Sequence, residues 1–334
     1  MAQKMRFFDF LYMRVIQTSC FAANSICGVG RKVWHMEFCD TFQRVQNGRV
    51  VYYLSAKLRA AGVRHGFSTR LGGVSTVPHL RQMNFGFLRG EDIETTRKNY
   101  RIFAGALGID PTRMVFTNQT HTTKVYPVGR QHAGVGVFTP PVYIPGSCKD
   151  DACNEVDGLV SGEKGLALGI RVADCVPVLL YDPVHGVAGA VHAGWRGTLG
   201  NICENALIQM EACGAMRENV ICAIGPAIGP CCYEVDADFA ARFFERLGQD
   251  LCHGLFVACE NGKYYCDLKT LNARLLCASG VPQAQIDVST CCTACDPHLF
   301  FSHRATQGKR GTMGAVIEVP ENAGIHEAKM ALRL

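Results

Sequence analysis

The chain has 334 residues, of which 48% are hydrophobic and 19% charged, enough apolar side chains for a sizeable core. This composition excludes an intrinsically disordered protein. The net charge of +5 is small and the chain has no long run of Lys and Arg, so the sequence points to neither nucleic acid nor an acidic membrane as a partner.

Residues 1–35 mix apolar and basic side chains, without an apolar run long enough to span a membrane and without a clean signal-peptide core. We expect a poorly ordered extension here, or a start codon placed too early. A catalytic domain over residues 36–320 and a short tail over 321–334 are expected to follow. The stretch 129–154 is rich in Gly, Pro and polar residues, which predicts a lid or an insertion.

Hydrophobic periodicity predicts the secondary structure of this domain. Apolar and alternating runs predict strands at residues 50–54, 65–68, 114–117, 156–161, 165–172, 176–181, 187–191, 220–224, 299–301 and 314–319. Helical spacing predicts helices at residues 56–61, 92–107, 199–213, 236–247 and 267–279. Thr198 is expected to cap the third helix and Gly214 to end it. Because strands between residues 166 and 192 follow one another without helices, we expect an α+β fold. It would be a single domain of mixed sheets flanked by helices, with a doubly wound Rossmann fold as the alternative.

Residues 172–200 contain the candidate chemistry. Cys175 begins one predicted strand and His192 ends the next, and a glycine-rich turn with Arg196 then leads into a helix. Cys and His are ligands that zinc prefers, and such a turn favours an anion. His121, which follows the strand at 114–117, is the best candidate for a third ligand. Taken alone, Cys175 is better interpreted as a core cysteine and His192 as a hydrogen-bonded core histidine. A cysteine nucleophile activated by His192 is a further alternative.

Seven motifs extend over nearly all of residues 36–319. They are HGFSTRLGGVS (65–75), NQTH (118–121), VDGLVS (156–161), ADCVPVLLYD (173–182), HAGWRG (192–197), IGPAIGPCCYEV (224–235) and CTACDPHLFFSHR (292–304). In these motifs the chain resembles the YfiH or laccase-domain family. This family is also called the multicopper polyphenol oxidase family, and its members are known as zinc-binding purine nucleoside phosphorylases.

The resemblance implies a zinc site made by His121, Cys175 and His192. Three protein ligands leave one position open, as in catalytic zinc sites. It implies phosphorolysis of adenosine, inosine, guanosine and methylthioadenosine, together with deamination of adenosine, in a cytoplasmic monomer or homodimer that binds neither nucleic acid nor membranes. A copper-dependent polyphenol oxidase is the first alternative. A zinc-stabilised protein that binds or edits cell-wall muropeptides is the second.

Further site residues are expected around this metal. The catalytic candidates are Asp174, Arg196 and Glu234. The candidates for binding phosphate or substrate are Arg70, Asn84, Gln119, Arg196 and Arg304. Arg196 is the first candidate for binding phosphate, because it lies in the glycine-rich turn. A structural arginine that binds carbonyl groups of this turn is the alternative.

The 18 cysteines do not indicate a disulfide scaffold. Cys203, Cys213, Cys222 and Cys277 lie within periodic helix or strand patterns, where cysteine is a small hydrophobe, so we expect a reducing compartment. Cys292 and Cys295 form a C-x-x-C motif, but no second pair occurs at zinc-ribbon spacing. We interpret this motif as free thiols.

Overall fold

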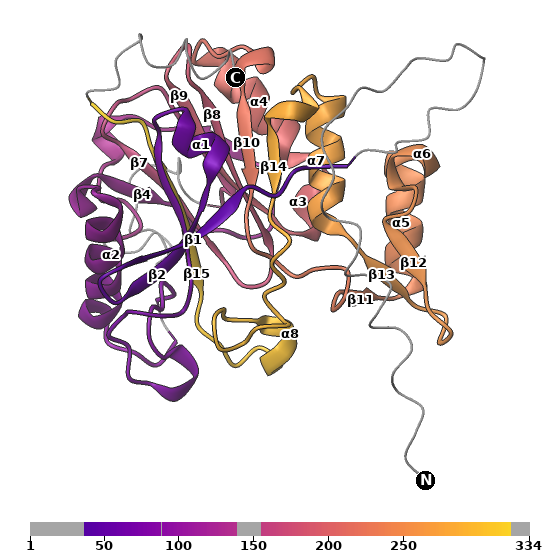
Figure 1. Ribbon diagram of the computed structural model, residues 1–334, viewed down its shortest axis with the longest axis horizontal. Helices are drawn as coiled ribbons and strands as arrows, with labels where there is room; N and C mark the ends of the chain where they lie inside the picture. The colour runs from indigo at the N-terminus through magenta and orange to yellow at the C-terminus, as the bar shows by residue number, and fades with distance from the viewer. Residues whose placement is uncertain (1–36, 88, 139–154, 322–334) are drawn as a thin grey trace. The chain divides into compact units, whose positions relative to one another are not determined.

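The computed structural model of the protein describes residues 37–87, 89–138 and 155–321. The expected N-terminal extension, the tail beyond residue 321 and residues 139–154 of the expected lid or insertion lie outside these ranges. Within them the chain forms an α+β fold with mixed sheets, as expected (Figure 1).

Two six-stranded sheets dominate the described residues, and each combines parallel and antiparallel pairs. The first sheet contains, in spatial order, β1 (Phe42–Asn47), β2 (Val50–Ser55), β3 (Arg64–Ser68), β15 (Met313–Glu318), β7 (Ala167–Val172) and β4 (Met114–Phe116). The second contains β14 (Ile286–Val288), β10 (Ile221–Ile224), β8 (Val176–Asp182), β9 (Val187–Ala193), β6 (Gly158–Ser161) and β5 (Val125–Pro127). A small antiparallel sheet contains β11 (Glu234–Val235), β13 (Tyr264–Cys266) and β12 (Phe256–Ala258).

Helices connect and cover these sheets. The α-helices are α1 (Ala56–Ala60), α2 (Ile93–Leu107), α3 (Trp195–Leu199), α4 (Ile202–Ala212), α5 (Ala237–Leu247), α6 (Gln249–Cys252), α7 (Leu268–Ala278) and α8 (His303–Thr306). Short 3₁₀ turns occur at Pro78–Leu80, Pro111–Arg113, Arg130–His132, Arg217–Asn219 and Gln283–Gln285. No helix in the described part of the chain is both long and apolar enough to span a membrane.

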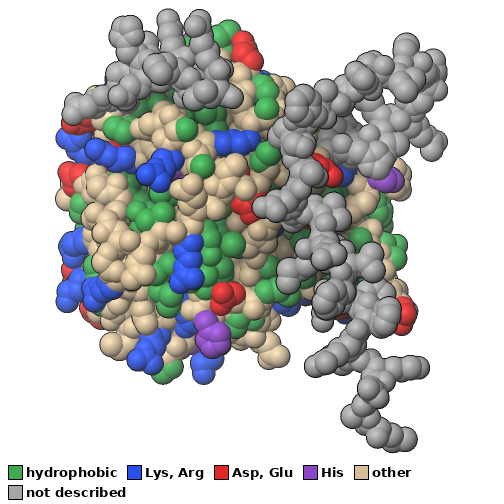
Figure 2. Space-filling model, viewed as in Figure 1, with side chains coloured by type: hydrophobic (Ala, Val, Ile, Leu, Met, Phe, Trp, Pro, Cys, Tyr) green, Lys and Arg blue, Asp and Glu red, His purple; other side chains and the backbone are tan. Residues whose placement is uncertain are grey.

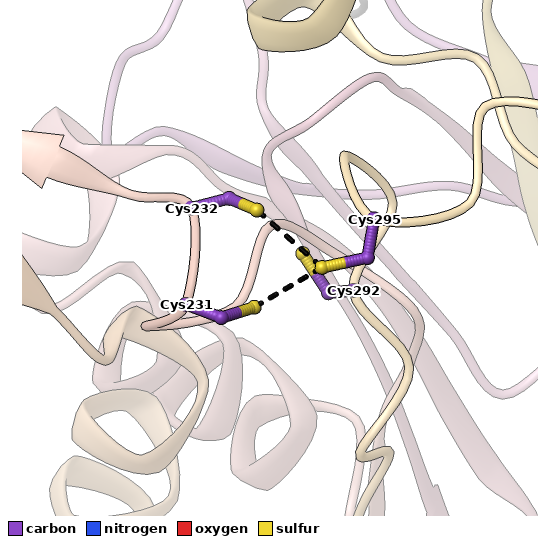
Figure 3. A group of neighbouring side chains, drawn as sticks. All are labelled: Cys231, Cys232, Cys292 and Cys295. Atoms are coloured by element: carbon purple, nitrogen blue, oxygen red, sulfur yellow. Dashed lines mark hydrogen bonds between the residues drawn. The ribbon is translucent and has the colours of Figure 1, made fainter. Parts of the chain in front are cut away.

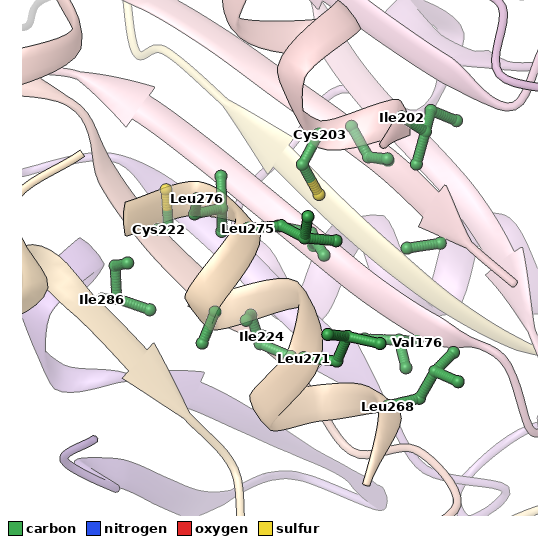
Figure 4. Packing of buried hydrophobic residues seen from close by; sticks show 14 of the residues in the cluster. Val176, Ile202, Cys203, Cys222, Ile224, Leu268, Leu271, Leu275, Leu276 and Ile286 are labelled. Atoms are coloured by element: carbon green, nitrogen blue, oxygen red, sulfur yellow. The ribbon is translucent and has the colours of Figure 1, made fainter. Parts of the chain in front are cut away.

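The second sheet has a hydrophobic core on each of its faces, because successive strand residues point in opposite directions. Along β8, Val178 and Leu180 pack in the core that contains α4 and α7, whereas Leu179 and Tyr181 pack in the core shared with the first sheet. Figure 4 shows the α7 side of this sheet, where Leu271 lies close to Ile224. The sheet that carries Cys175 and His192 is thus buried on both faces.

Helix α2 covers the other face of the first sheet. Its Tyr100 and Phe103 are fully buried in a core that contains Val316 of β15. The Asp92 side chain caps the helix at Thr95 N–H, and Gly108 ends it with a φ of 69°. The helix agrees closely with the one predicted at residues 92–107.

Two local predictions were wrong. Thr198 does not cap the helix after β9: it is buried within α3, and the chain breaks before α4 at Asn201, whose side chain accepts from Glu204 N–H. Asn201 has a φ of 54°, a left-handed conformation that asparagine tolerates. Residues 299–301 are not a strand, because the N–H groups of Leu299 and Phe300 bond to the Asp296 carbonyl in a turn.

The surface carries charges of both signs. In the view of Figure 2, Lys and Arg side chains are spread over the coloured part of the face, with Asp and Glu side chains among them. This distribution is typical of a solvated surface.

A buried histidine should make stability depend on pH. His65 is 3% exposed; its Nε2 accepts from Ser55 N–H at 3.0 Å, and burial lowers its pKa to about 4. In the unfolded chain the His65 imidazole takes up a proton near pH 6.5, whereas in the folded chain it stays neutral until about pH 4. As pH falls from about 6.5 to 4, the free energy of unfolding should therefore decrease by up to ~3 kcal/mol because of this residue.

Melting temperatures of the wild type and His65→Gln between pH 7 and pH 4.5 test this prediction. Glutamine offers an acceptor oxygen but does not titrate, so its melting temperature should fall less with pH. Parallel pH profiles would contradict the prediction.

Candidate active site

A cavity of about 510 Å³ opens where the ends of several strands meet. Its walls come from the β7–β8 connection, the β9–α3 connection, the segment after β4 and the segment from α8 to β15. The polar lining side chains include Arg89, Gln119, His121, Asp174, Cys175, His192, His303, Arg304 and Arg310, and the aromatic ones are Phe87, Trp195 and Tyr233. This volume is typical of a small-molecule site.

His121, Cys175 and His192 meet on one wall of this cavity. Their ligand atoms all lie within 4.8 Å of one another, and Cys175 Sγ is 3.9 Å from His121 Nε2. A tetrahedral zinc ion would hold such a sulfur and nitrogen about 3.6 Å apart, so small movements would complete the site. The donor set therefore fits zinc.

Neighbouring strands hold two of these side chains. Cys175 directly precedes β8, and His192 lies on β9, where it pairs with Pro177 of β8. Because β8 and β9 are antiparallel, the start of one lies beside the end of the other. His121 reaches them from the loop after β4 with a φ of 64°, which is uncommon for a residue other than glycine.

Asp157 organises both histidines and was not recognised from the sequence as part of the site. Its carboxylate is fully buried and accepts from the backbone N–H groups of Thr120, His121 and Thr122 at 2.7–3.2 Å. It also bonds His192 Nδ1 at 2.7 Å. That bond directs His192 Nε2 toward Cys175 and His121, as carboxylates do for histidines that bind metals. The sequence contained one signal for this role, because Asp157 is a charged residue directly before the buried strand β6.

The electrostatics favour a thiolate at Cys175. Burial raises the pKa of this thiol, but His192 and His121 outweigh burial and lower it to about 6. Burial lowers the pKa of His192, whereas Cys175 and Asp157 raise it, to about 9. A thiolate is the form that binds zinc, and metal binding releases the imidazole proton.

Gly194 packs directly against two of the three side chains. A Cβ on this glycine would lie 3.3 Å from Cys175 Sγ and 3.1 Å from His121 Cδ2, while its φ of −65° suits any residue. Gly194→Ala should therefore keep the fold but displace these side chains and lower zinc affinity by roughly tenfold, the lower end of what loss of ligand orientation costs.

Zinc competition titration measures this effect. Gly105→Ala on α2 is the control, because nothing lies within 4 Å of the added carbon. Equal zinc affinity in both variants would contradict the prediction.

Three other predicted residues line the cavity. Asp174 accepts from Thr293 Oγ1 at 2.6 Å and from Arg304 N–H at 2.8 Å. Gln119 Nε2 donates to the Arg171 carbonyl and Gln119 Oε1 accepts from the Arg171 N–H, both at 2.7 Å. The Arg304 guanidinium donates to the backbone carbonyls of residues 232 and 234.

Four predicted residues are not among the lining residues. Arg196 is exposed, with its guanidinium 4.3 Å from the centre of the Trp195 ring. Glu234 forms an ion pair with Lys263 at 3.0 Å. The other two make mostly backbone hydrogen bonds: Arg70 donates to the carbonyls of residues 81 and 297, and Asn84 bonds the backbone of residues 86 and 312.

Arg310 was not predicted, yet it lines the cavity close to the Cys175 wall. Its Nε is buried without a hydrogen-bond partner, and its Nη1 donates to the carbonyl of Gly311. Burial lowers its pKa to about 10, so the side chain stays charged at neutral pH. A half-buried cation with an unused, buried Nε donor suits an anionic ligand. Its place shortly before β15 carried no signal in the sequence.

Comparison with known proteins identifies the family. The family model described as multi-copper polyphenol oxidoreductase laccase matches residues 64–320. The chain belongs to this family. It is 36% identical to the purine nucleoside phosphorylase YlmD of Geobacillus stearothermophilus over 261 residues, which cover 77% of this chain and 90% of that protein.

Two further matches agree with this assignment. The adenosine deaminase RL5 of an unknown prokaryotic organism is 31% identical over 238 residues, which cover 71% of this chain and 87% of that protein. The crystal structure of YlmD from Geobacillus stearothermophilus has a TM-score of 0.72 at 34% identity, covering 84% of this chain and 100% of that one. The family resemblance and the fold class read from the sequence are confirmed.

Proposed function

We propose that the protein is a zinc-dependent purine nucleoside phosphorylase that also deaminates adenosine. The observation that carries this proposal is the convergence of His121, Cys175 and His192 on the wall of a cavity lined by arginines and aromatic rings. The names of the relatives supply the substrate class, purine nucleosides and, for one relative, adenosine. Within that class we propose adenosine, inosine, guanosine and methylthioadenosine, with phosphate, as the family resemblance implies.

The three ligands would hold zinc with one coordination position open. When bound, zinc supplies a Lewis acid and activates water for attack on the purine ring. The buried Asp157 keeps His192 oriented toward this position.

The arginines of the cavity would hold phosphate. Phosphorolysis develops positive charge on the sugar and needs an oriented anion to attack it. Arg310 has a buried Nε without a partner, so we assign phosphate to Arg310 before Arg196. Arg304 lines the same cavity and is the second candidate, although its guanidinium donates to two backbone carbonyls. Arg70 is a weaker candidate, because carbonyl groups also occupy its donors and it does not line the cavity.

The aromatic residues would hold the base, and a carboxylate would move the proton. Trp195 and Tyr233 offer ring faces on which a purine can stack. Asp174 accepts two hydrogen bonds and retains acceptor capacity, so it is the first candidate for a proton shuttle. Glu234 is second, because its carboxylate lies with Lys263 outside the cavity lining.

Chromatography of adenosine incubated with the zinc-loaded protein tests the function. With phosphate present, both adenine and hypoxanthine should form; without phosphate, only deamination should remain. If zinc is bound and no product forms under either condition, the proposal fails and a muropeptide-binding protein becomes the better interpretation.

The family's description favours one second candidate, a copper-dependent oxidase. Cysteine and two histidines are also the ligands of blue copper, in which a methionine is the usual weak axial ligand. No methionine occurs among the described residues that line this cavity. Oxygen uptake with a phenolic substrate by the copper-loaded protein would support the oxidase.

A further inference from the structure

Four cysteine side chains form a second cluster, separate from the three predicted ligands. Cys231 and Cys232 lie in the turn between β10 and β11, and Cys292 and Cys295 in a loop after β14. Figure 3 shows the four sulfur atoms pointing toward one another. All lie within 4.8 Å of one another, and Cys295 Sγ is 3.4 Å from both Cys231 Sγ and Cys232 Sγ.

The geometry suits a single metal ion. Zinc–sulfur bonds of about 2.3 Å place the sulfurs of a tetrahedral site ~3.8 Å apart, which lies within the observed spread. A multi-iron cluster contains bridging sulfides that hold its cysteine ligands further apart. Four thiolates around one ion are typical of structural zinc, because no position stays open for substrate.

We propose that Cys231, Cys232, Cys292 and Cys295 bind a structural zinc ion. Neither the nucleoside chemistry nor the His121 site is needed for this inference. The C-x-x-C motif of Cys292 and Cys295 lacked a second C-x-x-C in the sequence, and the fold supplies an adjacent pair instead.

The surroundings of the cluster support thiolates. The Gly229 N–H donates to Cys292 Sγ at 3.2 Å, as backbone amides do in thiolate metal sites. The ammonium of Lys269, which is 4% exposed, bonds the carbonyls of Ser289 and Cys291. Lys269 belongs to α7, and its ammonium places a positive charge beside the loop that carries Cys292, where it would offset part of the net negative charge of a zinc tetrathiolate.

The ion would fasten two loops that form part of the cavity wall. The Cys232 carbonyl accepts from Arg304, and Tyr233 follows it into the lining. On the other loop, Thr293 donates to Asp174. The cluster therefore supports the residues beside the cavity without lining it.

Zinc content measured by mass spectrometry of the full chain, purified under reducing conditions, tests the inference. The wild type should contain about two ions per chain, one at each site, and Cys292→Ser/Cys295→Ser should contain about one. The matched control Cys213→Ser/Cys259→Ser changes two cysteines outside both clusters and should keep two. Equal zinc in the wild type and the Cys292/Cys295 variant would overturn the inference.

Thiol labelling in a Cys175→Ala chain tests the site with the four cysteines intact, should their replacement prevent folding. Adding a chelator should make four more thiols reactive. If those thiols already react without chelator, they are free and the inference is wrong. It is also wrong if they react only after a reductant is added, with a mass that shows disulfides.

Discussion

Replacing Asp157 by asparagine should lower zinc affinity by roughly ten- to a hundredfold, the usual cost of losing the partner of a metal-binding histidine. The carboxylate accepts from three backbone N–H groups around His121 and bonds the ring of His192. An amide has one acceptor oxygen and presents an NH₂ group to some of these donors. Both histidine ligands would then lose their orientation. Competition titration with a chromophoric chelator measures the change.

Asp182→Asn is a matched control. Asp182 is also fully buried; it accepts from the N–H groups of Val184 and His185 and bonds His185 Nδ1 at 2.8 Å. It lies at the opposite end of β8 from Cys175. Asp182→Asn should lower the melting temperature and leave zinc affinity unchanged. Equal losses of zinc affinity in the two variants would show that Asp157 acts only through general stability.

Replacing Arg310 by glutamine should raise the KM for phosphate by roughly ten- to a hundredfold, since a hydrogen bond between charged groups contributes about 1.5–3 kcal/mol. Arg310 combines a place in the cavity wall with a buried Nε that has no partner. Deamination of adenosine and zinc content should change little, because neither uses phosphate. Initial rates at varied phosphate concentration measure the effect.

Arg196→Gln tests the alternative predicted from the sequence. Arg196 is exposed over the Trp195 ring and is not among the lining residues, so its loss should leave the KM for phosphate nearly unchanged. A raised KM in Arg196→Gln, with a normal KM in Arg310→Gln, would restore the sequence-based assignment and contradict ours.

Local sequence patterns predicted much of the fold. The strands around Cys175 and His192 were visible as apolar runs, and Asp92 and Gly108 were recognised as the ends of α2. Each of these signals depends on a few neighbouring residues. Thr198 was wrongly predicted as a cap because tertiary packing overrides the local signal. The residue is buried, and the chain bends at Asn201 instead.

The remaining site features depend on contacts between distant segments. Asp157 lies more than thirty positions from both histidines, and no periodic pattern links them. Arg310 lines the cavity because the segment before β15 passes along the cavity wall. Cys231 and Cys292 are brought together by two loops whose approach depends on the pairing of β10 with β14. Such contacts follow from the tertiary fold, and the sequence alone did not reveal them.

Zinc titration of the metal-free protein, with adenine formation from adenosine and phosphate as the readout, tests the central claim most directly. The rate should rise with added zinc and saturate once the wild type holds about one ion per chain more than Cys175→Ala, as three protein ligands at an open site require. The same titration of Cys175→Ala should give no rise. Full phosphorolysis by the metal-free protein, or an equal response from Cys175→Ala, would contradict the account.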